Sequence, residues 1–235
     1  MVKIFIDPGH GGKDPGATAN GLKEKDLTLK IALKMKDLLM QYEGVQVKLS
    51  RETDKYLPLS ERANMANKWE ADYFISIHVN AATNAAATGF ESYIYNGKYS
   101  GKQETHRKRS IIHAETMKQL TNVRDRGMKE ANFAVLRETK MGAVLTENLF
   151  ITNPNDAAKL KQDSWLQKIA QGHVNGVAIA FGLKKKQQPK PQPKSKKQVF
   201  YRVVTGSFQD RKNAEKRVQD LKKAGFDSFI DIYEN

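Results

Sequence analysis

The chain has 235 residues, 39% of them hydrophobic, and a net charge of +14. This length allows one sizeable core and a small additional unit. Because there is no cysteine, disulfides and thiolate metal sites are excluded, and a bound metal would need His, Asp or Glu ligands. No apolar run approaches the roughly 20 residues of a membrane-spanning helix, so we expect no membrane span. The N-terminus lacks the pattern of a signal peptide, so we expect synthesis in the cytoplasm without one.

The positive charge is concentrated near the C-terminus. Seven lysines and no acidic residue lie between Lys184 and Lys197. A cationic segment attracts polyanions such as nucleic acids, anionic membranes or anionic wall polymers, and charge alone does not choose among them. A soluble, extended linker explains the same composition equally well. A noncatalytic protein that binds cell walls or nucleic acid is therefore one function that the sequence leaves open.

The chain opens with a short apolar run, residues 2–6, that stops at a polar turn with glycines at 9, 11 and 12. This pattern predicts a buried first strand followed by a loop that carries His10. Ligands of open α/β sheets bind outside the carboxyl ends of the strands, which is where His10 would lie. A histidine that only packs in a turn is the competing interpretation.

Further elements follow in an alternating order. Apolar residues at spacings of three and four predict a helix that Asp26 caps, with Glu24 just outside its start. Patterning also predicts the remaining elements of this part of the chain, namely strands near 45–49, 73–81, 89–95, 133–136 and 142–148 and helices near 58–69, 100–120 and 165–181. This order predicts an α/β fold with a mostly parallel, twisted sheet flanked by helices.

The second strand that ends in a histidine is the informative one. His78 closes the apolar run that begins at residue 73, and two strands that both end in histidine at one sheet edge are an unusual arrangement for packing residues. A later strand ends in Glu147, and Glu24 precedes a helix. Two imidazoles and two carboxylates are the groups that a catalytic zinc site with a general base requires.

The other histidines are weaker candidates. His106 and His113 lie seven residues apart on a similar helix face, but the neighbouring arginines and lysine disfavour a metal ion. His173 lies inside an apolar helix, which is typical of a structural histidine. We therefore expect all three to serve packing.

Each acidic candidate also has a competing role. Glu24 could complement the N-terminus of the following helix, and Glu147 could be a fourth metal ligand or an ion-pair partner. Asp7 and Asn80 are candidates to orient the imidazoles. Glu91 is weakly placed for the site, and we leave it out.

From about Lys184 the composition changes to Lys, Gln, Pro and Ser, which predicts a semi-extended tether. Beyond it, alternation over 199–205 and 226–232 predicts two strands around a helix that Asp210 caps. The result would be a small α+β unit of βαβ type. We expect a catalytic domain over 1–182, a Lys/Pro-rich linker over 183–198 and the βαβ unit over 199–235.

Six stretches carry a family resemblance: IFIDPGHGGKDPGA, GLKEKDLTL, LSERANMAN, FISIHVNA, GFESYIY and AVLTENLFITN. Together they resemble the zinc-dependent N-acetylmuramoyl-L-alanine amidases of the amidase 3 type. The resemblance implies one zinc ion held by His10, Glu24 and His78, with Glu147 as the catalytic carboxylate. It further implies cleavage of the amide between the lactyl group of muramic acid and the L-alanine of the peptidoglycan stem peptide. A zinc peptidase acting on free peptides is the nearest alternative.

The tail resembles a peptidoglycan-binding module of sporulation and division proteins, through YRVVTGSF and AEKRVQDLKKAGF. That module contains two βαβ halves, and this chain supplies one. The half module could pair with a second chain to form a dimer, bind weakly or be a remnant. No specific nucleic-acid contact is expected. Without an export signal, the implied enzyme would reach the wall after release, as a phage endolysin or as a lytic enzyme of the sporulating mother cell.

Overall fold

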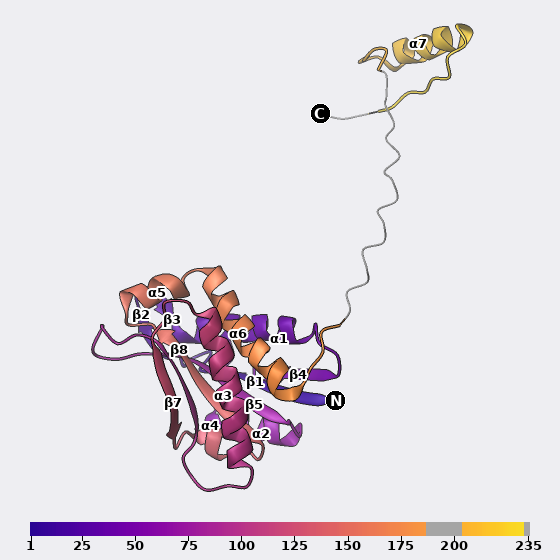
Figure 1. The fold of residues 1–235 in the computed structure, drawn as a ribbon. Coiled ribbons are helices and arrows are strands. Elements are labelled where there is room, and N and C mark those ends of the chain that lie inside the picture. Colours follow the sequence, from indigo (N-terminus) through magenta and orange to yellow (C-terminus); the bar gives the residue numbers. More distant parts are fainter. Residues whose placement is uncertain (187–203, 233–235) are drawn as a thin grey trace. The chain divides into compact units, whose positions relative to one another are not determined.

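The computed structural model describes residues 1–186 and 204–232, and the chain divides into two compact units, Met1–Gln187 and Gln188–Asn235. The first unit is built on a six-stranded sheet of order β4-β1-β5-β8-β6-β7 (Figure 1). Its strands are β1 (Val2–Pro8), β4 (Val45–Leu49), β5 (Tyr73–Asn80), β6 (Phe90–Tyr95), β7 (Asp125–Ala131) and β8 (Gly142–Phe150). Two short strands, β2 (Thr18–Ala19) and β3 (Leu22–Lys23), pair separately.

Most neighbouring strands are parallel. The pairs β1–β4, β1–β5, β5–β8 and β6–β7 run parallel, and β6 pairs antiparallel with β8. The apolar run of β5 explains its central place, since Phe74, Ile75 and Ile77 are fully buried and a parallel strand is covered on both faces. The expected mostly parallel α/β fold is confirmed.

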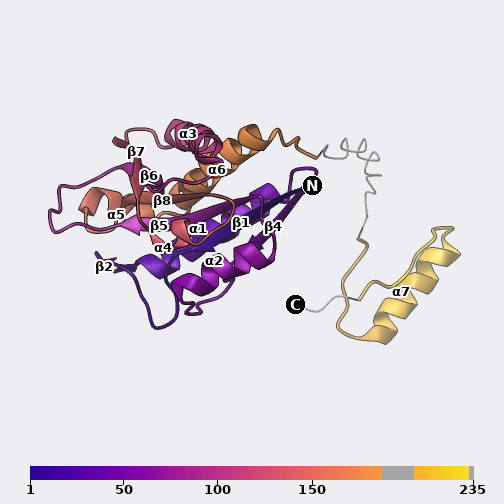
Figure 2. The same cartoon turned by 90° about the horizontal axis from the view of Figure 1, so that it is seen from below.

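Helices cover both faces of this sheet (Figure 2). On one face, α1 (Glu24–Leu39) and α6 (Asp163–Phe181) bury apolar side chains against β1 and β5, and α3 (Lys102–Gln119) packs on α6. On the other face, α2 (Leu59–Lys68) and the short α4 (Ala134–Arg137) cover a cluster around Phe5 and Phe74. A further short helix, α5 (Pro154–Leu160), follows β8. Among the described residues, no helix is both long and apolar enough to cross a membrane.

Three local predictions for this unit were wrong or incomplete. The run at 133–136 forms helix α4 and no strand, because a four-residue apolar segment has no periodicity that separates the two. Strand β7 was missed because its alternating half-exposed residues are largely polar, as on many sheet edges. Helix α1 begins at Glu24, not after Asp26, so Glu24 belongs to its first turn.

The C-terminal unit contains helix α7 (Arg211–Lys223), and its predicted cap is confirmed, since the Asp210 carboxylate accepts the backbone N–H of Lys212 at 2.7 Å. Residues 226–232 form no strand, although alternation predicted one. A strand exists only through hydrogen bonds to a partner strand, and none lies within 204–232. The other predicted strand, 199–205, falls mainly outside the described residues.

The first residues of the predicted linker contact the rest of the first unit. Leu183 packs against the main core, and the backbone N–H of Lys186 donates to the Gln41 carbonyl at 2.8 Å. The predicted boundary at 182 therefore lies within a segment that is still attached to the first unit.

Helices α3 and α6 approach so closely that a side chain is excluded at Gly176. A Cβ atom there would lie 2.4 Å from the Cα of Ile112, which is backbone that cannot rotate away. In a free helix, alanine is favoured over glycine by about 1 kcal/mol. We expect Gly176→Ala to lower the melting temperature despite this propensity. Ile179→Ala, on the exposed side of α6, serves as the control and should change the melting temperature little. A Gly176→Ala variant as stable as the parent would contradict the close packing of α3 on α6.

His173 lies in the core between α6 and β8. Its Nδ1–H donates to the Ile169 carbonyl at 2.8 Å, and its Nε2 accepts from the Thr146 hydroxyl at 3.0 Å. Burial lowers the pKa of His173 to about 4. The contact in which Nε2 accepts requires a neutral imidazole, and both contacts agree with the structural role predicted for this residue.

This histidine makes stability depend on pH. The unfolded chain takes up a proton near pH 6.5 and the folded chain only near 4, so stability is lost as the pH falls between these values. The loss amounts to about 3 kcal/mol in the free energy of unfolding. We expect His173→Gln to flatten this part of the pH dependence in urea titrations. The exposed His106→Gln serves as the matched control and should keep the slope of the parent.

Candidate metal and catalytic site

The loop after β1 is fixed by two buried arginines. Arg62 donates from Nη2 to the His10 carbonyl at 2.7 Å and from Nη1 to the Pro8 carbonyl at 2.7 Å. Arg51 donates to the carbonyls of Pro8 and Gly9 at 3.1 and 2.9 Å. Between these contacts His10 adopts a left-handed backbone conformation, with φ of 61°, which is uncommon for a residue with a side chain. The loop therefore presents the imidazole in one fixed orientation.

His10 and His78 meet because their strands are parallel neighbours. Pro8 of β1 lies opposite Ile77 of β5, so both strands end at the same edge. The two imidazole centroids are 5.0 Å apart, with the rings nearly perpendicular. Gly9 permits this approach, since a Cβ atom there would lie 2.3 Å from the His78 ring. The expected convergence of the two strand-end histidines is present.

Glu24 completes a three-ligand cluster from the first turn of α1. Its Oε2 lies 3.2 Å from His10 Nε2, and its Oε1 lies 2.9 Å from His78 Nδ1. One donor atom from each of these residues lies within 4.8 Å of the other two, and no other such cluster occurs in residues 1–186 and 204–232. Burial raises the pKa of Glu24, but the hydrogen bonds and charges of the two imidazoles outweigh it and hold that pKa far below its usual range.

Asp14 orients His10, a role that the sequence did not reveal. Its Oδ2 lies 2.9 Å from His10 Nδ1, so Nε2 is left to face Glu24. Burial lowers the pKa of His10, yet the carboxylates of Glu24 and Asp14 outweigh burial and the pKa is raised. The signal available in the sequence was a carboxylate four residues after the histidine in the same glycine-rich turn.

The two residues predicted to orient the imidazoles have other partners. Asp7 accepts from Ser50, Ser76 and Arg62 beneath the loop. Asn80 donates to Glu91 at 2.6 Å. Both predictions were wrong, because the polar atoms of these side chains are taken by partners other than the imidazoles.

Glu147 stands beside the cluster on the neighbouring strand. It pairs in register with His78 across β5 and β8, and both line a cavity of about 290 Å³ together with His10 and Glu24. Its Oε2 is shielded from solvent and has no hydrogen-bond partner among the described residues. Burial, and then the negative charges of Glu24 and Glu91, raise the pKa of Glu147 well above its usual range. The site thus contains a carboxyl group suited to holding a proton.

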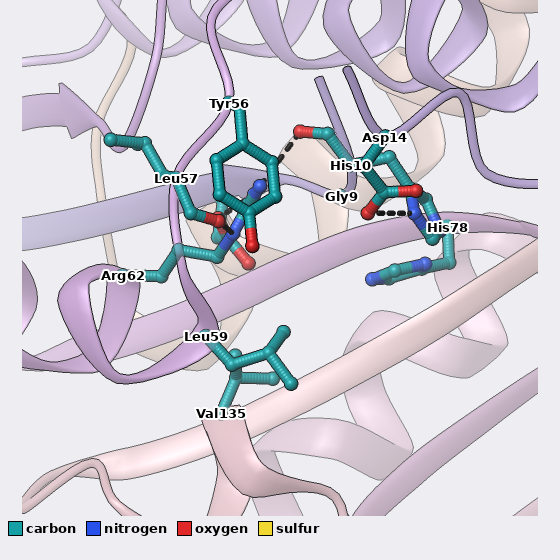
Figure 3. Close-up of a pocket in the computed structure, with 10 residues that line it drawn as sticks. Gly9, His10, Asp14, Tyr56, Leu57, Leu59, Arg62, His78 and Val135 are labelled. Atoms are coloured by element: carbon teal, nitrogen blue, oxygen red, sulfur yellow. Dashed lines mark hydrogen bonds and ion pairs between the residues drawn. The ribbon is translucent and has the colours of Figure 1, made fainter. Parts of the chain in front are cut away.

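A second, smaller cavity of about 80 Å³ adjoins the imidazoles on the side of α2 (Figure 3). Figure 3 shows His10, Asp14 and His78 on one side of it, with Tyr56 and Arg62 opposite and Leu59 and Val135 beyond them. Tyr56 is 39% exposed and Leu59 is 58% exposed, so apolar surface is available next to the metal-ligand cluster.

The remaining histidines lie outside the cluster. His113 is buried and contacts the Ser92 hydroxyl at 2.8 Å and an Asp125 carboxylate oxygen at 2.9 Å. His106 is exposed and contacts Ser110 within its own helix turn. Neither belongs to a three-ligand group in the described part of the chain, in agreement with their expected packing roles.

The Arg62 contacts lead to a stability prediction. Arg62→Met leaves the carboxylate of Asp7 buried without its cationic partner at 2.9 Å, and breaking a buried ion pair costs about 3–5 kcal/mol. We expect urea denaturation to show a loss of that size. The double variant with Asp7→Asn should recover part of it, because no unpaired charge remains. Equal stability of the single and double variants would contradict this account.

The comparisons with known proteins agree with this geometry. The family model described as N-acetylmuramoyl-L-alanine amidase matches residues 4–179, and the SPOR domain model matches residues 182–231. The chain is 48% identical over 231 residues to the sporulation-specific N-acetylmuramoyl-L-alanine amidase of Bacillus subtilis, covering 98% of this chain and 84% of that protein. It is 46% identical over 185 residues to the endolysin of Bacillus phage SPP1, covering 78% of this chain and 67% of that protein.

The fold has a close match among solved structures. The crystal structure of N-acetylmuramoyl-L-alanine amidase from Clostridium difficile superimposes with a TM-score of 0.73 at 38% identity, covering 77% of this chain and 97% of that one. The match to the family model spans the whole sheet and all four of His10, Glu24, His78 and Glu147. The chain therefore belongs to the N-acetylmuramoyl-L-alanine amidase family and carries a SPOR domain after its catalytic unit.

Proposed function

We propose that this protein hydrolyses the amide between the lactyl group of muramic acid and the L-alanine of the peptidoglycan stem peptide, using one zinc ion held by His10, Glu24 and His78. The observation that carries the proposal is the cavity that this cluster lines together with Glu147. Family membership supplies the substrate class.

The donor set fits zinc. Two imidazole nitrogens and one carboxylate oxygen are ligands that zinc accepts, and catalytic zinc sites use three protein ligands with one open position. When bound, zinc would polarise the amide carbonyl and lower the pKa of a water molecule at the open position to about 7. Asp14 would keep the proton of His10 on Nδ1, which leaves the Nε2 lone pair for the metal.

Glu147 would move the proton that amide hydrolysis requires. The attacking water oxygen forms a bond to the lactyl carbonyl carbon, and the Glu147 carboxylate takes one proton from that water. The carbon–nitrogen bond then breaks while Glu147 returns the proton to the alanine nitrogen, which leaves as an amine. The shielded position of Oε2 and the raised pKa of this carboxyl group both favour the protonated state between these two steps.

The SPOR domain would hold the enzyme on peptidoglycan, with the lysines that precede it adding affinity for anionic wall polymers. Relatives include a sporulation-specific amidase and a phage endolysin, and we propose that this chain likewise acts on the wall during one of these two lytic events. Dimer formation through the C-terminal unit remains a proposal, which sedimentation of the full chain would test.

If Glu147 transfers the proton and does not hold the metal, its replacement should reduce activity and leave metal binding intact. We expect Glu147→Gln to reduce wall lysis by about 10²–10⁴-fold, the usual contribution of a general acid–base group, while zinc content stays near one ion per chain. Dye release from labelled cell walls and elemental analysis measure the two quantities. Retained lysis would remove Glu147 from the mechanism.

The assignment of His78 as a metal ligand predicts that its loss removes zinc binding as well as activity. We expect His78→Ala to purify with little zinc and without lytic activity, and a chelator to inactivate the parent enzyme reversibly. Mass analysis of released fragments should show peptides with a new N-terminal alanine. Wall binding that is unaffected by zinc, with no released peptides, would favour the noncatalytic binding alternative.

A further inference from the structure

A buried carboxylate lies directly beside Glu147 on the adjacent strand. Glu91 of β6 pairs in register with Glu147 of β8, and Glu91 is 2% exposed. Four side chains donate hydrogen bonds to its two oxygens: Asn80, Tyr93, Arg126 and Lys129. A carboxylate with this many donors is ionised and held in one orientation. Glu91 is therefore a rigid anchor for the groups around it.

The anchored cluster borders the catalytic cavity. Asn80 lines that cavity and donates to Glu91 at 2.6 Å. Phe133 also lines the cavity, and its ring contacts the Tyr93 ring edge-on at a centroid distance of 5.2 Å. The cavity wall that leads from the cluster of His10, Glu24 and His78 toward β6 and β7 therefore includes Glu147, Asn80 and Phe133.

The guanidinium of Arg126 has hydrogen-bond donors without a partner in the described part of the chain. Its Nε binds Glu91 Oε2 at 2.8 Å, and its guanidinium lies 4.8 Å from the centre of the Phe150 ring. No acceptor for either Nη atom occurs in the described ranges 1–186 and 204–232, and the side chain is 26% exposed. Lys129 also binds Glu91 and is 39% exposed. Two cations share one carboxylate, so the cluster keeps one unbalanced positive charge.

The strand order places this positive charge at the sheet edge that carries the candidate site, within a few peptide residues of Glu147. Strands β6 and β7 run opposite to β8, so the start of β7 lies at the edge where β5 and β8 end. Adjacent strands are about 4.8 Å apart, which puts β7 about 10 Å from Glu147. An extended peptide advances about 3.5 Å per residue. A chain leaving the cleavage point would therefore pass the two cations at its second or third residue.

We propose that Arg126 and Lys129, anchored on Glu91, bind a carboxylate carried by the second or third residue of the stem peptide. The free Nη pair of Arg126 forms the planar fork that suits a carboxylate, and Lys129 adds a second charge. This inference rests on the proposed amidase function. It assigns the peptide side of the cleft to β6 and β7, and it makes acidic stem peptides the preferred substrates.

The test compares two soluble substrates. One is N-acetylmuramoyl-L-alanyl-γ-D-glutamyl-L-lysine with both carboxyl groups free, and the other is the same molecule with both groups amidated. We expect the parent enzyme to favour the free acid by about tenfold or more in kcat/KM, the effect of one good charge-assisted contact. Arg126→Gln should lose that preference through KM while keeping its activity on the amidated substrate.

Two further variants keep the test decisive. Lys129→Gln should reduce the same preference. Arg124→Gln removes an equal charge from an exposed residue immediately before the same strand and should leave the preference unchanged. An equal rate of the parent enzyme on both substrates, or a preference that survives in both Arg126→Gln and Lys129→Gln, would overturn the inference. Absence of cleavage of either substrate and of cell walls would instead overturn the proposed function.

Discussion

The candidate-site end of this fold depends above all on the buried guanidinium of Arg62, with Arg51 as a second support. Arg62 bonds to the carbonyls of Pro8, His10 and Leu57 and to the carboxylate of Asp7. These contacts fix a turn in which His10 holds a left-handed backbone, a conformation that costs about 1–3 kcal/mol when nothing supports it. The hydrogen bonds offset that cost, and they also satisfy carbonyl groups that would otherwise be buried without partners.

Glu24 and Glu147 have opposite electrostatic surroundings within one cavity. Glu24 lies in the first turn of α1 between two imidazoles, where the helix dipole and the rings favour its ionised form. Glu147 lies on β8, next to the strand that carries His78. One of its oxygens is shielded and the carboxylates of Glu24 and Glu91 are near, so its protonated form is favoured. Their neighbours alone thus separate two chemically identical side chains into an ionised carboxylate and a carboxyl group that favours protonation.

Sequence reasoning found the parts of the site that follow from strand order. His10 follows β1, His78 lies near the end of the parallel neighbour β5, and Glu147 lies within the next strand, β8. The apolar runs that lead into these polar residues were sufficient to predict them. Asp14 was not found, because its contact depends on the loop conformation. Strand β7 and its Arg126 were missed for a different reason, since an edge strand buries too little apolar surface to leave a periodic pattern.

Strand β8 occupies the centre of the sheet, between β5 and β6, although it is the last strand of the catalytic unit to be synthesised. Until it inserts, β5 and β6 each present an open edge, and such edges pair readily with other chains. His10, Glu24 and His78 are therefore present in the growing chain well before Glu147 can take its place. Completing the sheet requires long-range pairing of β8 with both neighbours, which is slow, and a chain interrupted before Gly142 would be prone to aggregate.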